Sequence, residues 1–383
     1  MAVASFLTWF WNERFWLPHN TTWADLRNTD DTTYPQASDL WIMIPYSIVL
    51  YMIRFIIERL VARPLGRKLK ISNIPNRPPS NNAVLEKVYS SITRNPKDER
   101  LTGLCKQLDW SERQVQRWFR RKREINRPSK LLKFSETVWR FIFYAGVFNF
   151  GLFAMNFTAP KCPWETRMCW VGYPDKQPLT VTAYWYYQTE LAFYTSCTIS
   201  QFFDIKRKDF WVMCIHHFAT ILLICFSYSV NMLNIGMLIM SLHDFSDVFL
   251  EASKIAKYMK HDVLATVGLI CFALTFTIAR IVYFPFWVLN SVWFDAWDVV
   301  GPFPSWYIFS LWLFLLQFLH IYWCSFIVKG VVKMAKQGGS ATDERSESED
   351  SDTDDAIDDR RKKSDGQGDA PTNGLTLRKS GGK

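Results

Sequence analysis

Residues 210–254 have the sequence FWVMCIHHFATILLICFSYSVNMLNIGMLIMSLHDFSDVFLEASK, which contains two long apolar segments joined by a short turn. Each segment, 210–230 and 234–252, has about the length at which an α-helix crosses the hydrocarbon core of a bilayer. Polar side chains lie inside both segments: His216 and His217 in the first, and His243, Asp244 and Asp247 in the second. Because such side chains are costly in lipid, they predict a functional site that faces the interior of a helical bundle.

Five further apolar segments raise the number of predicted membrane-spanning helices to seven. They lie at 39–58, 138–156, 183–203, 263–289 and 305–328. The chain also has 18 Trp, 15 Tyr and 30 Phe among its 383 residues, an aromatic content that a lipid-facing bundle accommodates readily. The sequence therefore predicts an all-α polytopic membrane protein with about seven transmembrane helices.

The distribution of Lys and Arg predicts the orientation of these helices, because basic loops favour the cytosolic side. Residues 59–137 hold 20 Lys and Arg against 7 Asp and Glu, whereas 290–304 hold no Lys or Arg. We therefore expect residues 1–38, which precede the first span at 39–58, in the lumen and the C-terminus in the cytosol. A luminal N-terminus would expose Asn20, which begins an Asn-Thr-Thr sequence, as a glycosylation acceptor.

The C-terminal segment 338–383 has the composition of a disordered cytosolic tail, because a run rich in Asp, Glu and Ser precedes a Gly-rich end and neither can form a core. Ser346, Ser348 and Ser351 lie among acidic residues. This setting suits phosphorylation by an acid-directed kinase, and a plain solvated tail is the alternative.

Residues 67–128 include a smaller helical unit on the cytosolic side. Leu101, Leu104 and Leu108 have helical spacing and precede the sequence WFRRKR, a pattern that resembles the last two helices of a homeodomain. The recognition helix of that family has an Asn that contacts adenine, and Arg121 occupies this position. We therefore expect this homeobox-like insert to have a structural or lipid-contacting role rather than to bind DNA.

The histidine pair and the aspartates lie at matched depths in their two predicted helices. His216 and Asp247 are each placed roughly 9–11 Å below the cytosolic face by the 1.5 Å rise per residue of a helix. Asp244 and Asp247 are three residues apart and share a helix face, so we expect both carboxylates to face the His pair. Simple polar contact between helices is the structural alternative, but the number of such residues favours a functional site.

A metal site is a further alternative at the same place. Four side chains could together hold one zinc ion: His216, His217, His243 and Asp247. Adjacent His residues diverge by about 100° around a helix, which makes joint ligation of one ion awkward. No metal is therefore predicted.

Outside this group of His and Asp residues, the sequence predicts one ion pair and leaves one disulfide open. Glu190 and Arg280 lie deep in their spans, and we expect them to form an ion pair because lone buried charges are costly. Cys162 and Cys169 share one short loop and could form a disulfide if that loop is luminal.

The run from His216 to Glu251 resembles the Lag motif of ceramide synthases, inside a larger TLC domain that would cover residues 135–330. The opening WFWNERFWLPHNTTWADL at 9–26 and the homeobox-like insert resemble vertebrate members of that family. The resemblance implies a six-helix bundle or barrel that encloses the active site of an enzyme of the endoplasmic reticulum. That enzyme would transfer an acyl group from acyl-CoA to a sphingoid base.

The resemblance also implies roles for individual residues. The catalytic residues would be His216, His217, Asp244 and Asp247. Apart from the resemblance, the positions of His243, Glu190 and Arg280 within the spans make them candidate supporting polar residues. A neutral His is suited to remove the proton of the sphingoid ammonium, and a route in which one His first accepts the acyl group remains open. No cofactor is expected, since acyl-CoA is itself a substrate.

The sequence NSVWFDAWDVVGPFPSW at 290–306 is most similar to the branch of the family that prefers palmitoyl-CoA. Trp293, Phe294, Asp295 and Trp297 are therefore candidates for setting acyl-chain length, with an interfacial aromatic belt as the alternative. The expected partners are acyl-CoA, a sphingoid base and membrane lipids, and the resemblance allows a homo- or heterodimer with other ceramide synthases. The alternative functions are a non-enzymatic TLC-domain lipid sensor and a membrane-tethered homeobox protein.

Overall fold

The computed structural model describes residues 8–71, 79–126, 129–204 and 209–337, and within these ranges the chain contains helices and loops but no β-strands. In the described part of the chain, six helical stretches are long and apolar enough to cross a membrane. Four of them are α8 (Lys130–Thr158), α10 (Phe210–Ser229), α11 (Leu233–Tyr258) and α14 (Ser305–Gln337).

The other two stretches are compound, because a change of helix type interrupts each. The first consists of η1 (Ala37–Ile42), α3 (Met43–Ile56), η2 (Ile57–Ala62) and α4 (Arg63–Lys68). The second consists of α12 (Asp262–Phe276), η4 (Thr277–Leu289), η5 (Ser291–Asp295) and α13 (Ala296–Val299). The segments η2, η4 and η5 are π-helical, and η4 contains Pro285, which has no backbone N–H to donate.

The predicted span at 183–203 forms α9 (Val181–Ser200), which packs against α3, α8 and α10. It is not among the six most apolar stretches, and two of its polar residues, Gln188 and Glu190, are completely buried. The seven predicted spans thus correspond to seven long helical stretches, six of which have the length and apolarity of a membrane span.

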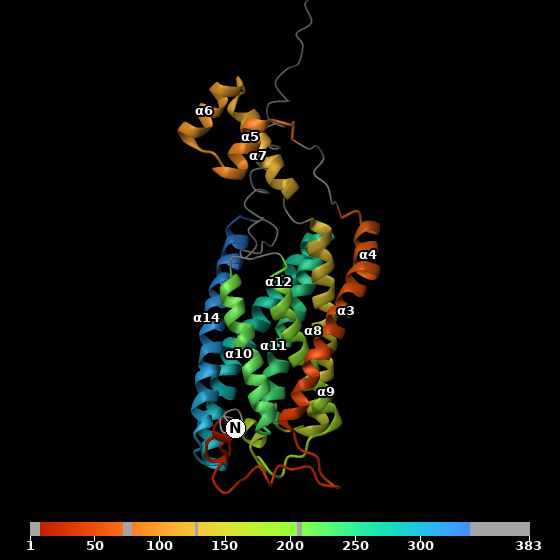
Figure 1. Ribbon diagram of the computed structural model, residues 1–383, viewed down its shortest axis with the longest axis vertical. Coiled ribbons are helices and arrows are strands. Elements are labelled where there is room, and N and C mark those ends of the chain that lie inside the picture. The colour runs from red at the N-terminus through yellow and green to blue at the C-terminus, as the bar shows by residue number, and fades with distance from the viewer. Residues whose placement is uncertain (1–7, 72–78, 127–128, 205–208, 338–383) are drawn as a thin grey trace, which may run out of the picture.

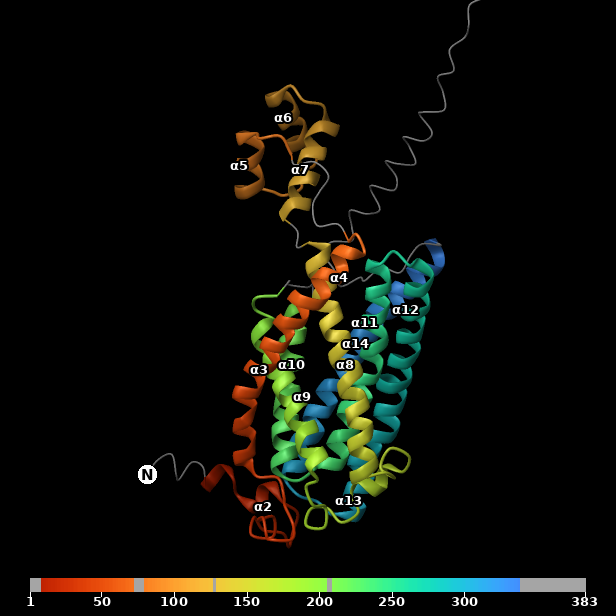
Figure 2. The same ribbon diagram turned by 90° about the vertical axis from the view of Figure 1, so that its right-hand side faces the viewer.

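Six of these stretches form a closed ring. In order around it, α8, α9, α10, α14, the α12–η4 stretch and α11 each pack against the next, and α11 returns to α8. Figures 1 and 2 show them running side by side along the long axis of the molecule. The α3 helix lies outside the ring against α9, while η2 and α4 lie against α8. The expected six-helix bundle is therefore present, with an interior that can hold a site.

The two ends of the bundle differ. At one end lies the insert, formed by α5 (Ala83–Ser91), α6 (Asp98–Leu108) and α7 (Glu112–Asn126). We call this the insert end. At the opposite end lie α2 (Glu13–Trp16) and the loop containing η3 (Thr166–Cys169), and we call it the disulfide end.

The insert has a hydrophobic core of its own. It buries Leu85, Val88, Tyr89, Leu101, Leu104, Val115, Trp118 and Phe119. The indole N–H of Trp118 donates to the Ser80 carbonyl at 2.7 Å. The Asn82 side chain accepts from the N–H groups of Val84 and Leu85 and so caps α5. The insert therefore folds as a compact three-helix unit.

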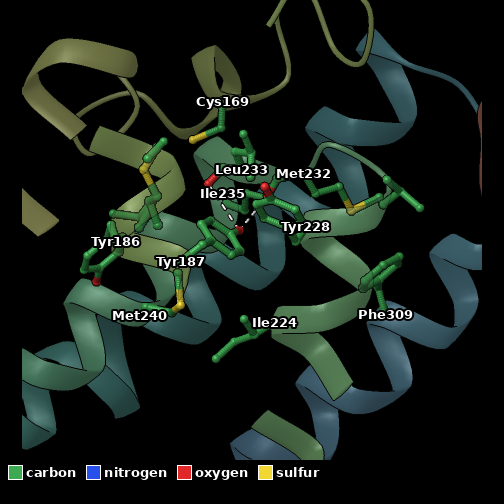
Figure 3. Packing of buried hydrophobic residues seen from close by; sticks show 14 of the residues in the cluster. Cys169, Tyr186, Tyr187, Ile224, Tyr228, Met232, Leu233, Ile235, Met240 and Phe309 are labelled. Carbon is green, nitrogen blue, oxygen red and sulfur yellow. Dashed lines mark hydrogen bonds between the residues drawn. The ribbon is translucent and has the colours of Figure 1, made fainter. Parts of the chain in front are cut away.

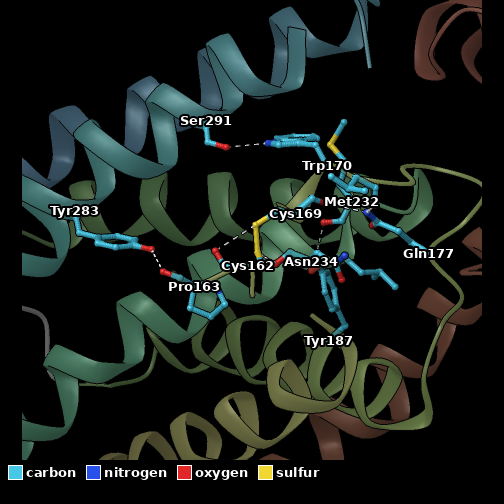
Figure 4. Close-up of a disulfide and its surroundings, with 12 residues drawn as sticks. Cys162, Pro163, Cys169, Trp170, Gln177, Tyr187, Met232, Asn234, Tyr283 and Ser291 are labelled. Carbon is cyan, nitrogen blue, oxygen red and sulfur yellow. Dashed lines mark hydrogen bonds between the residues drawn. A yellow bond between two sulfur atoms is a disulfide. The ribbon is translucent and has the colours of Figure 1, made fainter. Parts of the chain in front are cut away.

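The disulfide end is closed by the N-terminal segment and by cross-linked loops. Trp16 stacks on Phe226 at 4.9 Å between ring centroids, and Ser305 donates its hydroxyl to the Trp16 carbonyl at 3.0 Å. Cys162 and Cys169 form a disulfide with a Cα–Cα distance of 4.9 Å (Figure 4). The pairing that the sequence left open is thus present.

Aromatic side chains fill the ring near this end. Figure 3 shows Tyr187 of α9 beside Tyr228 of α10, with a distance of 5.6 Å between ring centroids, and Tyr186 of α9 to one side of this pair. The Tyr187 hydroxyl donates to the carbonyl of Met232 at 3.2 Å. Tyr173 is also buried here, in the loop before α9, and burial raises the pKa of its phenol above the ordinary value. Its hydroxyl donates to the Val230 carbonyl at 3.0 Å.

Candidate active site

The ring encloses a polar cavity of about 240 Å³ that extends toward the insert end. Its wall includes His216, His217, His243, Asp247 and Arg280. Charged side chains gather where it approaches the insert end: Arg54, Arg140, Lys254 and Lys257 with Asp204, Asp209 and Glu251. We call this space the polar cavity.

An apolar cavity of about 70 Å³ occupies the other half of the ring, toward the disulfide end. Its wall is mostly aliphatic and aromatic, and includes Leu223, Ile224, Ile235, Met240, Phe309, Leu313 and Leu316. Trp170, Val292 and Trp306 line its far part, close to the loops of the disulfide end. This wall can hold a hydrocarbon chain but no charged group.

The two cavities meet at the histidines, as the order of residues along α11 shows. Ile235 and Ile239 line the apolar cavity, Asp247 lines the polar cavity, and His243 lines both. On α10, His216 also lines both cavities. The apolar cavity extends about 12 Å along α11 from Ile235 to His243, from the 1.5 Å rise per residue.

His243 is held by hydrogen bonds at both ring nitrogens. Its Nδ1 lies 2.6 Å from the Ile239 carbonyl, which can only accept, so Nδ1 carries the proton. Its Nε2 therefore accepts from Nε2 of His320 on α14, at 2.8 Å. His320 is completely buried. Because both nitrogens are occupied, this imidazole is fixed in tautomer and orientation.

The His216 and His217 rings are held by packing instead. The Tyr194 ring lies edge-on to both, at 6.2 Å from His216 and 6.0 Å from His217, and Trp323 packs against His216 at 5.2 Å. Among the described residues, no group bonds to the Nδ1 atom of either ring. These two imidazoles are therefore the ones that are free to exchange a proton with a molecule in the cavity.

Asp247 and Arg280 form an ion pair at 2.8 Å in the wall of the polar cavity. Arg280 also donates to the His243 carbonyl at 2.7 Å. The predicted pair of Glu190 with Arg280 is therefore wrong. The reason is the order of the ring: Arg280 lies in η4, which packs against α11, α12 and α14, while Glu190 lies in α9, which packs against α3, α8, α10 and α11.

Asp244 and Glu190 form the second buried acidic contact. Both are buried, with 2% and 0% of their surface exposed, and the two carboxyl groups interact directly. Asp244 thus faces α9 and lines neither cavity. The expectation that both aspartates face the His pair is incorrect: Asp247 reaches the same cavity, and neither carboxylate is found bonded to His216 or His217 among the described contacts.

The arrangement of possible metal ligands follows from these contacts. Within the described ranges, no group of three or more His, Cys, Asp or Glu side chains is positioned to hold a metal ion. Both ring nitrogens of His243 are hydrogen-bonded, to Ile239 and to His320, and Asp247 is bonded to Arg280. The four residues considered as zinc ligands therefore do not converge on one point.

Comparison with known proteins adds two domain matches and several relatives. The TLC domain model matches residues 133–329 and the homeodomain model matches 79–127. Ceramide synthase 5 of Mus musculus is 42% identical over 90% of this chain and 82% of its own length. Human ceramide synthase 5 is 42% identical over 90% and 87%, and human ceramide synthase 4 is 39% identical over 92% and 88%. The chain belongs to the ceramide synthase family.

In this ceramide synthase family member, the buried histidines lie within the matched TLC domain. The homeodomain match covers α5 to α7. Arg121 is half-buried on α7. The domain match thus covers the packing pattern of the insert, while the position of the adenine-contacting Asn is occupied by Arg.

The residues predicted to set chain length lie near the far part of the apolar cavity. Trp293 packs on Phe314 at 4.3 Å, Phe294 is 64% exposed and Trp297 is 40% exposed. Asp295 lies 3.7 Å from Arg167. The cavity wall itself includes their neighbour Val292, and also Trp306, whose indole donates to the Val292 carbonyl at 2.7 Å. The four predicted side chains therefore lie behind or beside the wall of the apolar cavity and do not form part of it.

The predicted modification sites have different outcomes. Asn20 is exposed at the disulfide end, in the left-handed region at φ 71°. The N–H and hydroxyl of Thr22, in the same Asn-Thr-Thr sequence, donate to Asp25 and hold the pKa of that carboxyl below its ordinary value. Ser346, Ser348 and Ser351 lie outside the described residues.

Sequence reasoning missed two residues of this site. His320 lies in an otherwise apolar span and has no polar neighbour in sequence at helical spacing except Gln317, so only its contact with His243 identifies it. Tyr194 is one of several Tyr in α9, and it is distinguished only by lining both cavities.

Proposed function

We propose that this protein is an acyl-CoA-dependent sphingoid base N-acyltransferase, which makes ceramide or dihydroceramide. The observation that carries the proposal is the junction of the two cavities. Imidazoles lie where a cavity with charged walls meets one with hydrocarbon walls, inside a chain that belongs to the ceramide synthase family. Acyl-CoA suits two adjoining cavities of this kind, since its nucleotide is charged and its acyl tail is apolar.

The binding mode follows from the chemistry of the walls. The phosphates of acyl-CoA would lie near Arg54, Arg140, Lys254 and Lys257, because basic side chains bind phosphate. The acyl chain would enter the apolar cavity. From Trp306 to Leu316 its wall spans about 15 Å of α14, which is about half of a 30 Å bilayer core and so about the depth of one leaflet. This depth suits one long acyl chain.

The chemistry requires proton transfer at the amine. The sphingoid ammonium loses a proton to His216 or His217, and the amine nitrogen then attacks the thioester carbon. As the C–N bond forms, the carbonyl electron pair moves to oxygen. Its return breaks the C–S bond, and the departing thiolate takes up one proton while the second proton lost by nitrogen is released. Arg280 bonds to both Asp247 and the His243 carbonyl, so it fixes this part of α11 against η4 and keeps His243 beside the reacting groups.

Two routes share this geometry. In the first, the amine attacks acyl-CoA directly. In the second, an unprotonated nitrogen of His216 or His217 takes the acyl group and releases CoA, and the amine then displaces the imidazole. With acyl-CoA alone, only the second route releases CoA and adds the mass of one acyl chain to the protein. Neither route needs a cofactor, because the thioester is already activated.

The finer substrate choice belongs to the same proposal. The resemblance of residues 290–306 to the palmitoyl-CoA-preferring branch supports palmitoyl-CoA as the preferred donor. Trp293, Phe294, Asp295 and Trp297 would act on chain length by positioning Val292 and Trp306 in the cavity wall. Exchange of residues 290–300 for the corresponding residues of a very-long-chain relative should shift the preferred acyl-CoA upward.

We also propose that the disulfide end lies in the lumen of the endoplasmic reticulum and the insert end in the cytosol. A disulfide between Cys162 and Cys169 is typical of an oxidising compartment, and the basic segment 59–137 is expected to stay in the cytosol. Asn20 would then be glycosylated. The serines at 346, 348 and 351 would be accessible to cytosolic kinases, and dimerisation with the same or another ceramide synthase would use the membrane-embedded surface.

The proposal is tested with the purified chain in lipid vesicles. Ceramide formation is measured with sphinganine and a series of acyl-CoAs of graded length, by mass spectrometry. We expect amide product with long saturated donors, and loss of that product in His216→Ala and His217→Ala. A folded protein that binds these lipids without forming amide would instead be a TLC-domain lipid sensor.

A further inference from the structure

Three of the described residues line both cavities: Tyr194, His216 and His243. The thioester carbonyl must lie at this junction if the nucleotide occupies the polar cavity and the tail occupies the apolar one. Two of the three side chains are imidazoles, and the third is a phenol. The junction therefore contains one neutral hydroxyl donor beside the groups that transfer protons.

We propose that Tyr194 is a further catalytic residue, whose hydroxyl donates a hydrogen bond to the thioester oxygen as it becomes an oxyanion. The inference rests on the proposed acyl transfer. When the amine nitrogen bonds to the carbonyl carbon, an electron pair moves to that oxygen, and a positioned donor stabilises this charge more than it stabilises the neutral carbonyl. The Tyr194 proton stays on the phenol, and the pair returns when the C–S bond breaks.

The other side chains near the junction are either hydrogen-bonded within the protein, ionised, or used in proton transfer. Both nitrogens of His243 are hydrogen-bonded, to Ile239 and to His320. Arg280 donates to Asp247 and to the His243 carbonyl. His216 and His217 are assigned to proton transfer. Tyr144 also has a phenol in the wall of the polar cavity, but it does not line the apolar one. The Tyr194 hydroxyl is therefore the neutral donor that lies at the junction itself.

The hydroxyl of Tyr194 also differs from those of the neighbouring buried tyrosines. Tyr186 bonds to Ser241, Tyr187 to the Met232 carbonyl and Tyr228 to Asp39. For Tyr194, no hydrogen bond is found within the described part of the chain, and the residue is half-buried where it faces the cavities. Its ring is fixed by edge contacts with His216 and His217. A rigid ring with an unbonded hydroxyl is arranged to donate to a ligand.

The test compares two substitutions that each remove one hydroxyl from α9. Tyr194→Phe keeps the ring contacts and removes no hydrogen bond within the protein, so its thermal stability should equal that of the wild type. We expect its kcat to fall about 100-fold or more, with KM for acyl-CoA within about twofold, because the lost bond is made mainly in the transition state.

Tyr187→Phe is the matched control on the same helix (Figure 3). Because it removes a hydroxyl that bonds to the Met232 carbonyl, it should lower thermal stability and leave kcat within about twofold. Wild-type kcat in Tyr194→Phe, a change in KM alone, or a loss of stability like that of Tyr187→Phe would each overturn the inference. If the wild type forms no ceramide in the same assay, the proposed function itself fails.

Discussion

The insert and the membrane bundle are both helical, but they bury different side chains. The insert fills its core with apolar groups, and its charged residues lie outside that core. The bundle buries polar groups among its apolar ones, including His217, His243, Asp244, Glu190 and His320. Apolar residues of similar volume would pack the bundle at lower cost.

This difference shows where function can be inferred from packing. In the insert, the apolar core is explained by folding. The homeodomain match therefore supports the fold of the insert and assigns no role to its surface. In the bundle, the buried polar groups have no explanation in folding alone and therefore point to chemistry. Variants that remove polar groups from the bundle should accordingly change activity more than variants of the insert surface.

The largest effect on kcat is expected for His216 and His217, whose Nδ1 atoms have no hydrogen-bond partner among the described residues. His216→Ala and His217→Ala should each lower kcat by roughly 10²–10⁴-fold, the usual contribution of a general base. Expression should be retained, because neither Nδ1 atom is bonded to a described residue. The lost ring contacts with Tyr194 and Trp323 should lower thermal stability, and thermal unfolding measures this loss separately from kcat. The control is His261→Ala, which removes an exposed imidazole before α12. Near-normal turnover in either cavity variant would remove that residue from the mechanism.

The second effect concerns the ion pair of Asp247 and Arg280, which are 21% and 7% exposed. Arg280→Met should cost about 3–5 kcal/mol of stability, because it leaves a buried charge without its partner. The double variant Asp247→Asn/Arg280→Gln should recover much of that stability while kcat stays down by up to about 100-fold, since His243 is no longer held in register.

The control for this pair is the exposed contact of Arg167 with Asp298, which are 47% and 70% exposed. Arg167→Gln should change stability by less than about 1 kcal/mol. Thermal unfolding and initial rates on the same preparations separate the two quantities. Equal effects at both pairs would mean that the Asp247 pair has no special role.

The sequence predicted much of the bundle, because hydrophobic length is visible in one dimension. It located the spans and the six-helix bundle, and it placed His216 and Asp247 in the two helices whose side chains line one cavity. It could not assign partners, because these depend on the order of helices around the ring. Arg280 and Glu190 have compatible charge and depth, yet α9 and η4 are not neighbours. His320 could not be found either, since its role depends on a contact 77 positions away.

A smaller effect is expected at His320, which reaches the cavity only through His243. His320→Ala removes the donor to Nε2 of His243 and should lower kcat about tenfold, as expected for one buried hydrogen bond. His320→Gln retains an N–H donor and should restore most of that rate. The pH dependence of kcat should shift in the Ala variant and return in the Gln variant. A uniform loss of stability in both variants, without this recovery, would indicate a packing role.

A still smaller effect concerns the far part of the apolar cavity. Trp306→Leu should enlarge the space beside Val292 and improve kcat/KM for longer donors relative to palmitoyl-CoA, by about fourfold for each additional CH₂ that becomes buried. Tyr307→Ala is the control, because this neighbouring residue is 62% exposed and does not line the cavity. The readout is product formation from mixed acyl-CoAs. An unchanged product distribution in Trp306→Leu would place the chain-length determinant elsewhere.

The smallest effect is expected on the insert surface, at Arg121. Restoring the residue of the homeodomain with Arg121→Asn should leave ceramide formation within about twofold of the wild type, because the side chain lies outside the core of the insert. The wild-type chain should bind labelled duplexes only weakly and without sequence preference, and this binding should disappear between about 50 and 200 mM salt, since it would rest on phosphate contacts alone. Trp118→Ala is the contrasting variant: its indole is 3% exposed and bonded to Ser80, so it should destabilise the insert. Sequence-specific binding by the wild type that persists at 200 mM salt would show that the insert reads DNA without the Asn.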